Sequence, residues 1–596
     1  MSGGGVQSTL PEVVDHDLIF VEEFDALSIE LRMVQDTEDA FEDIAPETSP
    51  KRKYPAKLHA QKVAKELGVK EGLIYLPGLP TQLYEDSDMG PQFRQRRYFY
   101  YIAGANFENC AVTYDLANDS LVLWVPYIDP RQVLWYGTSP GPKECLAKTD
   151  LDDVRYTKDL DAFLRKRLTL GGANTADVFR VGAPIGSNFC SDKNSRSATA
   201  SSNSSKRSTS SASSSSTTLF VLHPDQIPDV LRDDSSTFTL DSTRLQPAMD
   251  AARVVKTPYE IDLIRKANDI SSAAHTAVLR QLKGMTNEQD IEAEFLDHCL
   301  AVHGAKHQSY PVIAGSGPNA GVLHYFGNDE PLAGRQLVCL DAGAEWDLYA
   351  SDVTRTFPIS GTFTPEAAAI YSAVQRMQNE VFSRFKPGAP FAYLHLHAAY
   401  VAAQELLRLG ILKDGSATDI LAKGTISAFF PHGLGHHVGL EVHDVLSSDL
   451  MSRPPTDEAG ATKNFSTRTK HVRNQLGGMK RQPVTPDMYA TLMSEAAAVS
   501  NGDVSAFFTQ QDRRRLLEPG MIVTVEPGIY FCRPYIESFF LVDPTHAKYI
   551  NKDILERYYG VGGVRIEDCL LVTEDGYDNL TTAPKGDEAL RIIKGK

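Results

Sequence analysis

The chain has 596 residues, a net charge of −17 at pH 7 and a hydrophobic fraction of 42%. Its size allows three or more domains, and two large domains with insertions fit equally well. Its composition is typical of a soluble globular protein. Because phosphate contacts need clustered lysine and arginine, the negative charge disfavours a nucleic-acid partner. Since no apolar run approaches the roughly 20 residues of a membrane span, no membrane partner is expected either.

Residues 1–50 are acidic and show no sustained periodicity, which predicts a loosely ordered arm. Acidic residues at this end do not fit a secretory or transit signal. The seven cysteines are scattered, odd in number and without paired spacing, as expected for free thiols in a reducing compartment. These features together predict a cytoplasmic protein.

Residues 51–250 are expected to form an α/β domain. A helical segment covers residues 56–64, and apolar runs at 72–76, 98–102 and 121–125 are typical of strands. Alternation of strands with helices favours an α/β fold.

Two further features of this domain have no assigned role. Arg94, Arg96 and Arg97 form a basic cluster, and an ion-paired or solvated surface explains it as well as a functional site does. Residues 188–218 are dominated by serine and lack the apolar side chains that offset ordering entropy, so they are expected to form a disordered insert.

The second domain is expected to span residues 251–596. Thr257-Pro258-Tyr259-Glu260 is a capping box with proline at the first helical position, and a second box begins at Thr286. Thr364 precedes a third helix, and a fourth is expected at about 391–409. Between about 446 and 515 the apolar pattern lapses, which indicates an insertion.

Four acids of this domain lie within or at the end of strand-like apolar runs. They are Asp341, Asp352, Glu526 and Glu567. Carboxylates are rarely buried in such places unless they are paired or bind a cation. A hairpin between the first two would bring them together, and one carboxylate from each of four strands would then line one face of a sheet.

Three histidines, His432, His436 and His443, lie between the second and third acids in a glycine-rich stretch, Pro431 to Asp444. Four carboxylates and a histidine form an oxygen-rich set that suits two divalent metal ions. Glu441 and Asp444 of the same stretch are expected beside the ligands or at the surface.

The local sequences around these residues resemble those of the pita-bread dinuclear metallopeptidases, and most closely the prolidase and aminopeptidase P (Xaa-Pro aminopeptidase) family. The matching pieces are Leu340 to Gly343, Ser351 to Pro358, His432 to Asp444, Thr524 to Tyr530 and Gly562 to Asp568. Lys53 to Lys57 and Phe93 to Phe99 resemble the creatinase-like domain that precedes the catalytic domain in aminopeptidases P. The resemblance implies a two-domain α/β protein, with a creatinase-like α/β N-terminal domain followed by a pita-bread α+β catalytic domain.

The same resemblance implies a role for each residue. Asp352 and Glu567 would bridge two metal ions, Asp341 would complete one coordination sphere, and His436 and Glu526 would complete the other. His443 would stabilise the tetrahedral intermediate, His432 and His324 would contact the substrate, and Arg565 would orient Glu567 or engage the substrate. Because oxygen ligands dominate, Mn²⁺ fits best, and zinc or cobalt could substitute.

The implied activity is hydrolysis of the Xaa-Pro peptide bond by a metal-bridging hydroxide. The enzyme would release the N-terminal residue from peptides with proline in second position. A prolidase, which cleaves only Xaa-Pro dipeptides, is the alternative, and an inactive pita-bread module that binds peptides or proteins is a more distant one. The sequence leaves a homodimer open.

Overall fold

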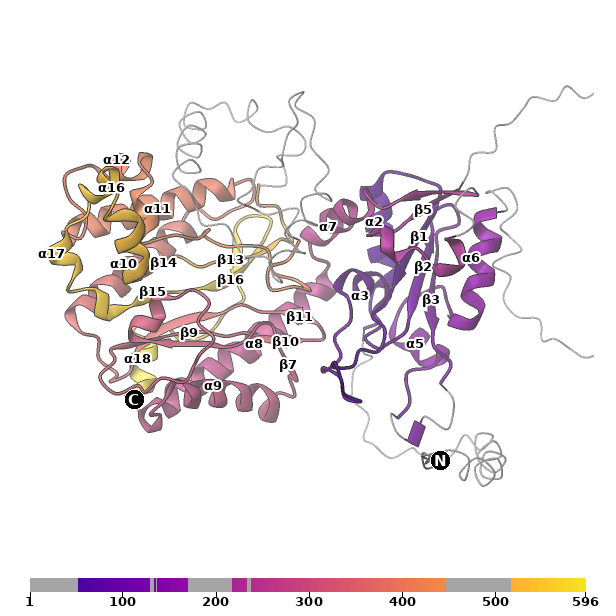
Figure 1. Cartoon of the computed structure of the whole chain (residues 1–596), viewed down its shortest axis with the longest axis horizontal. Helices are drawn as coiled ribbons and strands as arrows, with labels where there is room; N and C mark the ends of the chain where they lie inside the picture. The colour runs from indigo at the N-terminus through magenta and orange to yellow at the C-terminus, as the bar shows by residue number, and fades with distance from the viewer. Residues whose placement is uncertain are drawn as a thin grey trace, which may run out of the picture.

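The computed structural model describes residues 52–128, 133–134, 137–169, 217–232, 237–445, 450 and 516–595. Two regions lie side by side, a smaller N-terminal one and a larger one that begins with helix α8 (Figure 1). The predicted arm at 1–50 lies outside the described residues, as does nearly all of the predicted insertion at 446–515. No helix in the described ranges is both long and apolar enough to cross a membrane.

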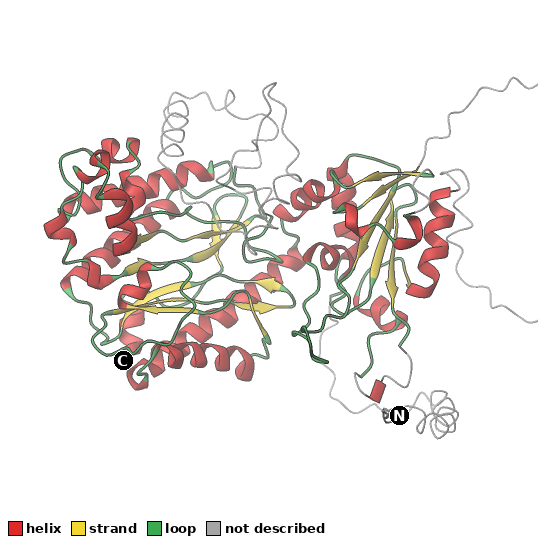
Figure 2. Ribbon diagram, viewed as in Figure 1, coloured by secondary structure: helices red, strands yellow, loops and turns green. Residues whose placement is uncertain are grey.

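The N-terminal region is built on one mixed six-stranded sheet of order β4-β3-β2-β1-β5-β6. Its strands are β1 (Leu73–Pro77), β2 (Ala111–Asp115), β3 (Ser120–Val125), β4 (Asp153–Tyr156), β5 (Thr217–Phe220) and β6 (Phe238–Asp241). Alternating residues of β1 face opposite sides, so Ile74 packs in a different core cluster from Leu73. Helices therefore cover both faces (Figure 2), namely α2 (Ala56–Leu67), α3 (Arg97–Ala103), α5 (Pro142–Lys148), α6 (Leu160–Thr169) and α7 (Leu245–Val254).

One strand prediction in this region is wrong. Residues 98–102 lie in helix α3 and not in a strand. The helix is buried on every side, with Phe99, Tyr101 and Ile102 at most 1% exposed. A short, fully buried apolar run shows neither helical nor strand periodicity, so its sequence alone does not separate the two.

The C-terminal end of the predicted serine-rich insert is wrong by two residues. Residues 188–216 lie outside the described residues, but Thr217 and Thr218 pair with β6 as the first residues of β5. The proposed boundary between residues 250 and 251 stays a prediction.

Helices of the second region begin where local sequence predicts. Thr257 accepts a hydrogen bond from the backbone of Glu260 at the start of α8 (Pro258–Gln281), which confirms the capping box. The next helix, α9 (Glu288–Asp297), is capped by Asn287 and not by Thr286, so the second predicted box is wrong by one residue. The two later helices, α10 (Pro365–Phe382) and α11 (Phe391–Arg408), also lie where they were expected.

The strands of this region form several small sheets. Three of these sheets have three strands each, in the orders β12-β9-β8, β13-β16-β17 and β11-β10-β7. A two-stranded sheet pairs β14 with β15. Their bounds are β7 (His307–Gln308), β8 (Ile313–Ser316), β9 (Leu337–Asp341), β10 (Ala344–Trp346), β11 (Tyr349–Ala350), β12 (Thr354–Pro358), β13 (Ile522–Val525), β14 (Gly528–Tyr530), β15 (Gly563–Arg565), β16 (Asp568–Val572) and β17 (Tyr577–Asn579).

These strands lie between two helical layers. Helices α8 and α9 share one core cluster with β9, and α10 and α11 share another with β13 and β15. Short helices complete the region, namely α12 (Ala417–Ala422), α15 (Arg533–Tyr535), α16 (Pro544–Ala547), α17 (Lys552–Leu555) and α18 (Asp587–Ile593). The functional residues predicted from the sequence lie on the strands and loops between the layers.

Candidate metal centre

Asp341 and Asp352 meet across an antiparallel strand pair. Asp341 ends β9 and lies opposite Thr354 at the start of β12, and Asp352 precedes that strand by two residues. The Tyr310 hydroxyl lies between the two carboxylates, 2.7 Å from Asp341 Oδ1 and 2.6 Å from Asp352 Oδ1. The expected hairpin therefore brings these acids together.

Glu526 and Glu567 lie just outside strands. Glu526 directly follows β13, and Glu567 lies in a break between β15 and β16, within a run that was predicted to be strand-like throughout. The break arises because Glu567 leaves its own sheet and bridges to Thr354, whose carbonyl oxygen accepts its N–H at 3.1 Å. The expectation of one acid from each of four strands is wrong, since only Asp341 lies inside a strand.

His436 points at two of these acids. Its Nε2 lies 3.2 Å from Asp352 Oδ2 and 3.5 Å from Glu526 Oε1. Its Nδ1 lies 2.9 Å from the carbonyl oxygen of His437, which accepts a hydrogen bond only if Nδ1 carries the proton. This hydrogen bond leaves the Nε2 lone pair directed at the acids, as a metal-binding histidine requires.

The backbone around His436 runs along β13. Its N–H donates to Thr524 Oγ1 at 3.1 Å, and the Thr524 N–H donates back to the His436 carbonyl at 2.8 Å. A Cβ on the preceding residue, Gly435, would lie 1.9 Å from the Thr524 carbonyl oxygen. Glycine is thus required there for the loop to approach the strand.

Six donor residues fall into three overlapping groups in the part of the chain that the structure describes. Within each group, one ligand atom of each residue lies within 4.8 Å of those of the other two. The first group is Asp341, Asp352 and Glu567, the second is His436, Glu526 and Glu567, and the third is Asp352, His436 and His443. Because three residues each belong to two groups, the arrangement suits two adjacent ions that share ligands.

The electrostatics of the centre favour cations. Glu567 is 1% exposed, and its Oε1 has no hydrogen-bond partner. Burial first, and then the charges of Asp352, Glu526 and Asp341, raise the pKa of Glu567 well above its usual value. Four crowded carboxylates with an unsatisfied buried oxygen are unfavourable unless positive charge joins them, so the residues present fit divalent metal ions.

His443 lies against His436, with ring centroids 4.4 Å apart and planes at 77°. Burial lowers the pKa of His443, and the nearby charge of Glu526 opposes this shift without cancelling it. The imidazole is therefore held towards its neutral form. Its membership in one donor group means that the geometry also allows it to reach a metal ion.

The predicted substrate residues differ in exposure. His432 is 6% exposed; its Nε2 lies 2.8 Å from the Tyr530 hydroxyl and its Nδ1 3.9 Å from Glu526 Oε2. His324 is exposed and stacks beside Phe326. The first therefore lies in the wall of the centre and the second at its solvent side.

Arg565 is buried and fully engaged with the centre. It donates to Asp341 Oδ2 at 2.6 Å, to Thr354 Oγ1 at 3.0 Å and to the Tyr530 hydroxyl at 3.0 Å. Thr354 in turn donates to Glu567 Oε2 at 2.6 Å. These contacts place Arg565 behind the carboxylates rather than in front of them.

Three hydroxyl groups of the centre were not predicted from the sequence. Tyr310, Thr354 and Tyr530 each hydrogen-bond to predicted site residues. Thr354 lies two residues after Asp352, and strand alternation gives both residues the same face. The sequence could therefore have predicted Thr354 as a site residue. No pattern marks the two tyrosines.

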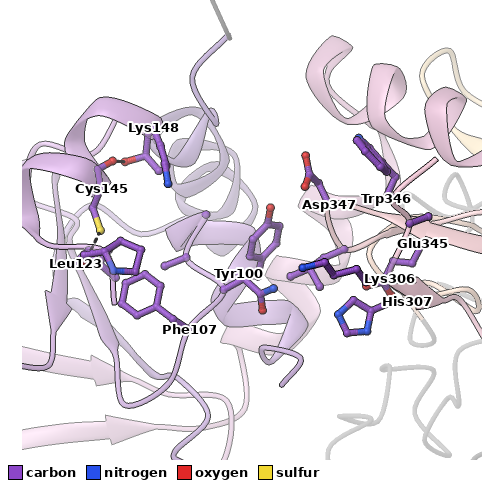
Figure 3. A pocket seen from close by; sticks show the side chains of 18 residues that line it. Tyr100, Phe107, Leu123, Cys145, Lys148, Lys306, His307, Glu345, Trp346 and Asp347 are labelled. Atoms are coloured by element: carbon purple, nitrogen blue, oxygen red, sulfur yellow. Dashed lines mark hydrogen bonds between the residues drawn. The ribbon is translucent and has the colours of Figure 1, made fainter. Parts of the chain in front are cut away.

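A separate cavity of about 510 Å³ lies between the two regions (Figure 3). Lys148 of α5 borders it on one side, and Lys306 and Asp347 border it on the other. None of the nine predicted site residues lines this cavity. The metal centre is thus distinct from the opening between the regions.

Comparisons with known proteins agree with this geometry. The model of metallopeptidase family M24 matches residues 262–481 and 485–574, and that of the aminopeptidase P N-terminal domain matches 57–175. A probable Xaa-Pro aminopeptidase of Colletotrichum graminicola is 48% identical, over 98% of this chain and 99% of its own length. One of Metarhizium acridum is also 48% identical, over 97% and 99%.

Solved structures of Escherichia coli aminopeptidase P show the same fold. The zinc-substituted enzyme in complex with product superposes with a TM-score of 0.63 at 23% identity, covering 91% of this chain and 99% of the other. The enzyme with the inhibitor Pro-Leu gives the same TM-score at 22% identity.

Fold and site together define a two-domain metallopeptidase in which a creatinase-like domain precedes a pita-bread catalytic domain. The chain belongs to metallopeptidase family M24. The resemblance inferred from the sequence motifs is confirmed.

Proposed function

We propose that this protein hydrolyses the Xaa-Pro peptide bond in a metal-dependent reaction and releases the N-terminal residue of peptides with proline in second position. The observation that carries the proposal is the convergence of three overlapping donor groups between the helical layers. It occurs in a chain that aligns over nearly its full length with probable Xaa-Pro aminopeptidases.

Asp341, Asp352, His436, Glu526 and Glu567 are proposed to hold two divalent ions. Asp352 and Glu567 are the bridging candidates, because they are the two carboxylates that each belong to two donor groups, and a carboxylate has one oxygen for each ion. When bound, such ions supply a water molecule of lowered pKa and polarise the scissile carbonyl. Manganese is the proposed metal, since oxygen donors dominate the set.

The remaining residues are proposed to bind and orient. A neutral His443 can donate a hydrogen bond to the oxyanion that develops on the scissile carbonyl, and the lowered pKa of its ring favours that form. His432 forms the wall beside Glu526, and His324 is exposed where a peptide enters. For Arg565 the contacts favour positioning of Asp341 and, through Thr354, of Glu567.

A dedicated site is needed because an Xaa-Pro bond has no N–H. Peptidases that recognise that N–H by a hydrogen bond cannot do so here. The metal centre and His443 address only the scissile carbonyl, so they serve dipeptides and longer peptides alike. Selection for length must come from groups beyond the proline, where His432, His324 and Arg565 do not distinguish the two classes.

The decisive experiment compares kcat/KM for an Xaa-Pro dipeptide and for the same peptide extended by one residue, in protein loaded with manganese. Hydrolysis of the Xaa-Pro bond in the tripeptide is expected, with the dipeptide also accepted. Turnover of the dipeptide alone would make the protein a prolidase.

Removal of the metal tests the more distant alternative, an inactive binding module. Chelation is expected to abolish hydrolysis, and added manganese to restore it. Zinc and cobalt are compared at the same concentration. Activity that survives chelation, with elemental analysis showing no metal, would refute the proposed chemistry.

A cytoplasmic location and a homodimer are also proposed. The six cysteines within the described residues are free thiols, which suits a reducing compartment. Subcellular fractionation tests the first proposal. Sedimentation at several protein concentrations tests the second.

A further inference from the structure

The loop between His436 and His443 is anchored differently at its two ends. His436 is held directly by β13, through reciprocal backbone and side-chain hydrogen bonds to Thr524. The ring of His443 packs on His436, but its backbone lies beyond that ladder. The neighbouring backbone hydrogen bond is that of the Asp444 N–H, which donates to the His437 carbonyl at 2.9 Å. The position of His443 therefore depends on what holds Asp444.

Asp444 is held by two buried cations. Arg253 of α7 donates to its Oδ1, and Lys256 Nζ lies 3.0 Å from Oδ2. All three side chains are at most 3% exposed. Burial alone would raise the pKa of Asp444, but Arg253 and Lys256 outweigh it and lower this pKa. The carboxylate is thus charged and fixed in position.

The side chains of Arg253, Lys256 and Asp444 are closely packed against the loop. A Cβ on Gly439 would lie 2.3 Å from Asp444 Oδ2 and 3.1 Å from Lys256 Cε. The guanidinium of Arg253 stacks on Tyr98 at 4.8 Å. Arg253 is therefore clamped between a helix of the N-terminal region and the loop.

The N-terminal region also contacts the middle of the loop. Val438 and Leu440 are buried in the same core cluster as Tyr101. Arg97, the first residue of α3, lies with its Nε 3.5 Å from Glu441 Oε1 and donates to Glu345 Oε2 at 2.8 Å. Side chains of the N-terminal region thus support the second half of the loop.

We propose that Arg253 and Arg97 are positioning residues of the active site, which place His443 through Asp444 and Glu441. The inference rests on the proposed function. It assigns to the N-terminal region a role in orienting a catalytic group of the second region. Because His436 has its own anchor on β13, loss of these ion pairs is expected to displace His443 and leave the metal ligands in place.

The test is Arg253→Gln in the full chain, with kcat, KM, bound metal and Tm measured for an Xaa-Pro-Yaa peptide. We expect kcat to fall at least about tenfold, as for other residues that orient catalytic groups, with KM and metal content unchanged. Arg253→Lys keeps a cation beside Asp444 and is expected to recover most of kcat. A merely structural role would lower Tm without this rescue of kcat.

The matched control is Arg167→Gln. Arg167 forms a buried ion pair of the same kind with Asp115, inside the N-terminal region and without any residue of the loop. Its kcat should equal that of the wild type. An equal loss of kcat in both variants, or loss of metal together with kcat in Arg253→Gln, would overturn the proposal, as would an unchanged kcat in a folded Arg253→Gln protein.

If Arg253→Gln does not fold, Glu441→Gln decides. The Glu441 side chain is 52% exposed, and after its replacement the buried Arg97 keeps its hydrogen bond to Glu345. We expect a severalfold lower kcat at full metal content, and an unchanged kcat overturns the proposal. Failure of the wild type itself to cleave Xaa-Pro peptides with any divalent ion would refute the proposed function instead.

Discussion

Hydroxyl and guanidinium groups of the catalytic region bind the carboxylates Asp341, Asp352 and Glu567, whereas side chains of the N-terminal region hold the second half of the histidine loop. Tyr310, Thr354 and Arg565 donate to these carboxylates over distances of 2.6–2.7 Å. The loop residue Asp444 is bound instead by Arg253, from a helix that packs on α2. Metal binding and catalytic orientation therefore have separate supports.

This separation predicts that defects on the carboxylate side appear as loss of metal, and defects on the loop side as loss of rate with metal retained.

Asp352→Asn should release at least one metal ion and lower kcat by more than about a thousandfold, since metal ions supply several kcal/mol of transition-state stabilisation. Elemental analysis and peptide hydrolysis measure the two effects. Asp347→Asn is the control, because Asp347 lies in the turn between β10 and β11 and borders the separate cavity. Two bound ions with normal activity in Asp352→Asn would contradict a bridging role.

His443→Ala should keep both metals and lower kcat about 10²–10³-fold, the cost of removing one oxyanion donor. His303 lies at the end of the helical turn that follows α9, and His303→Ala should have no effect on kcat. Release of metal from His443→Ala would show that this histidine is a ligand, and the two sides of the centre would then not separate as described.

Thr354→Val removes the hydroxyl that connects Arg565 to Glu567 without changing the size of the side chain. Metal affinity should fall about 10–100-fold, as for other residues that orient ligands. Isothermal titration of the metal-free protein measures it. Thr356→Val is the matched control, because the Thr356 hydroxyl contacts only the backbone of Arg565. Equal affinities in the two variants would contradict the orienting role.

Glu260→Gln should act on stability and leave kcat nearly unchanged. Burial would raise the pKa of Glu260, but His59, Lys62 and the Thr257 N–H outweigh it and lower this pKa to about 2. Because the folded pKa lies below the unfolded one, the charged carboxylate stabilises the fold by about 3 kcal/mol above pH 4.5. That contribution is lost as pH falls from 4.5 towards 2.

Denaturant unfolding at a series of pH values measures this difference. The free energies of unfolding of wild type and Glu260→Gln should differ most near neutral pH and converge in acid. A difference that is independent of pH would mean that packing, and not charge, accounts for the effect.

Local sequence determined much of the fold of this protein. The capping boxes at Thr257 and the cap at Thr364 predicted where α8 and α10 begin, because those contacts join residues only three positions apart. The residue types also indicated a dinuclear metal centre, since carboxylates at the ends of apolar runs are rarely buried unless they are paired or bind a cation. The fold class and family followed from motifs of a few residues each.

Tertiary structure decided what depends on distant partners. The apolar run at residues 98–102 fits a helix or a strand, and only the tertiary structure makes it a helix. Glu567 left its strand because Thr354, 213 positions away, accepts its N–H. The engagement of Arg565 with Asp341 and of Arg253 with Asp444 likewise joins segments far apart in the chain. The local sequence does not predict these ion pairs. A buried charged side chain must pair with an opposite charge that is buried beside it, and which residues are buried together is decided only when the layers pack.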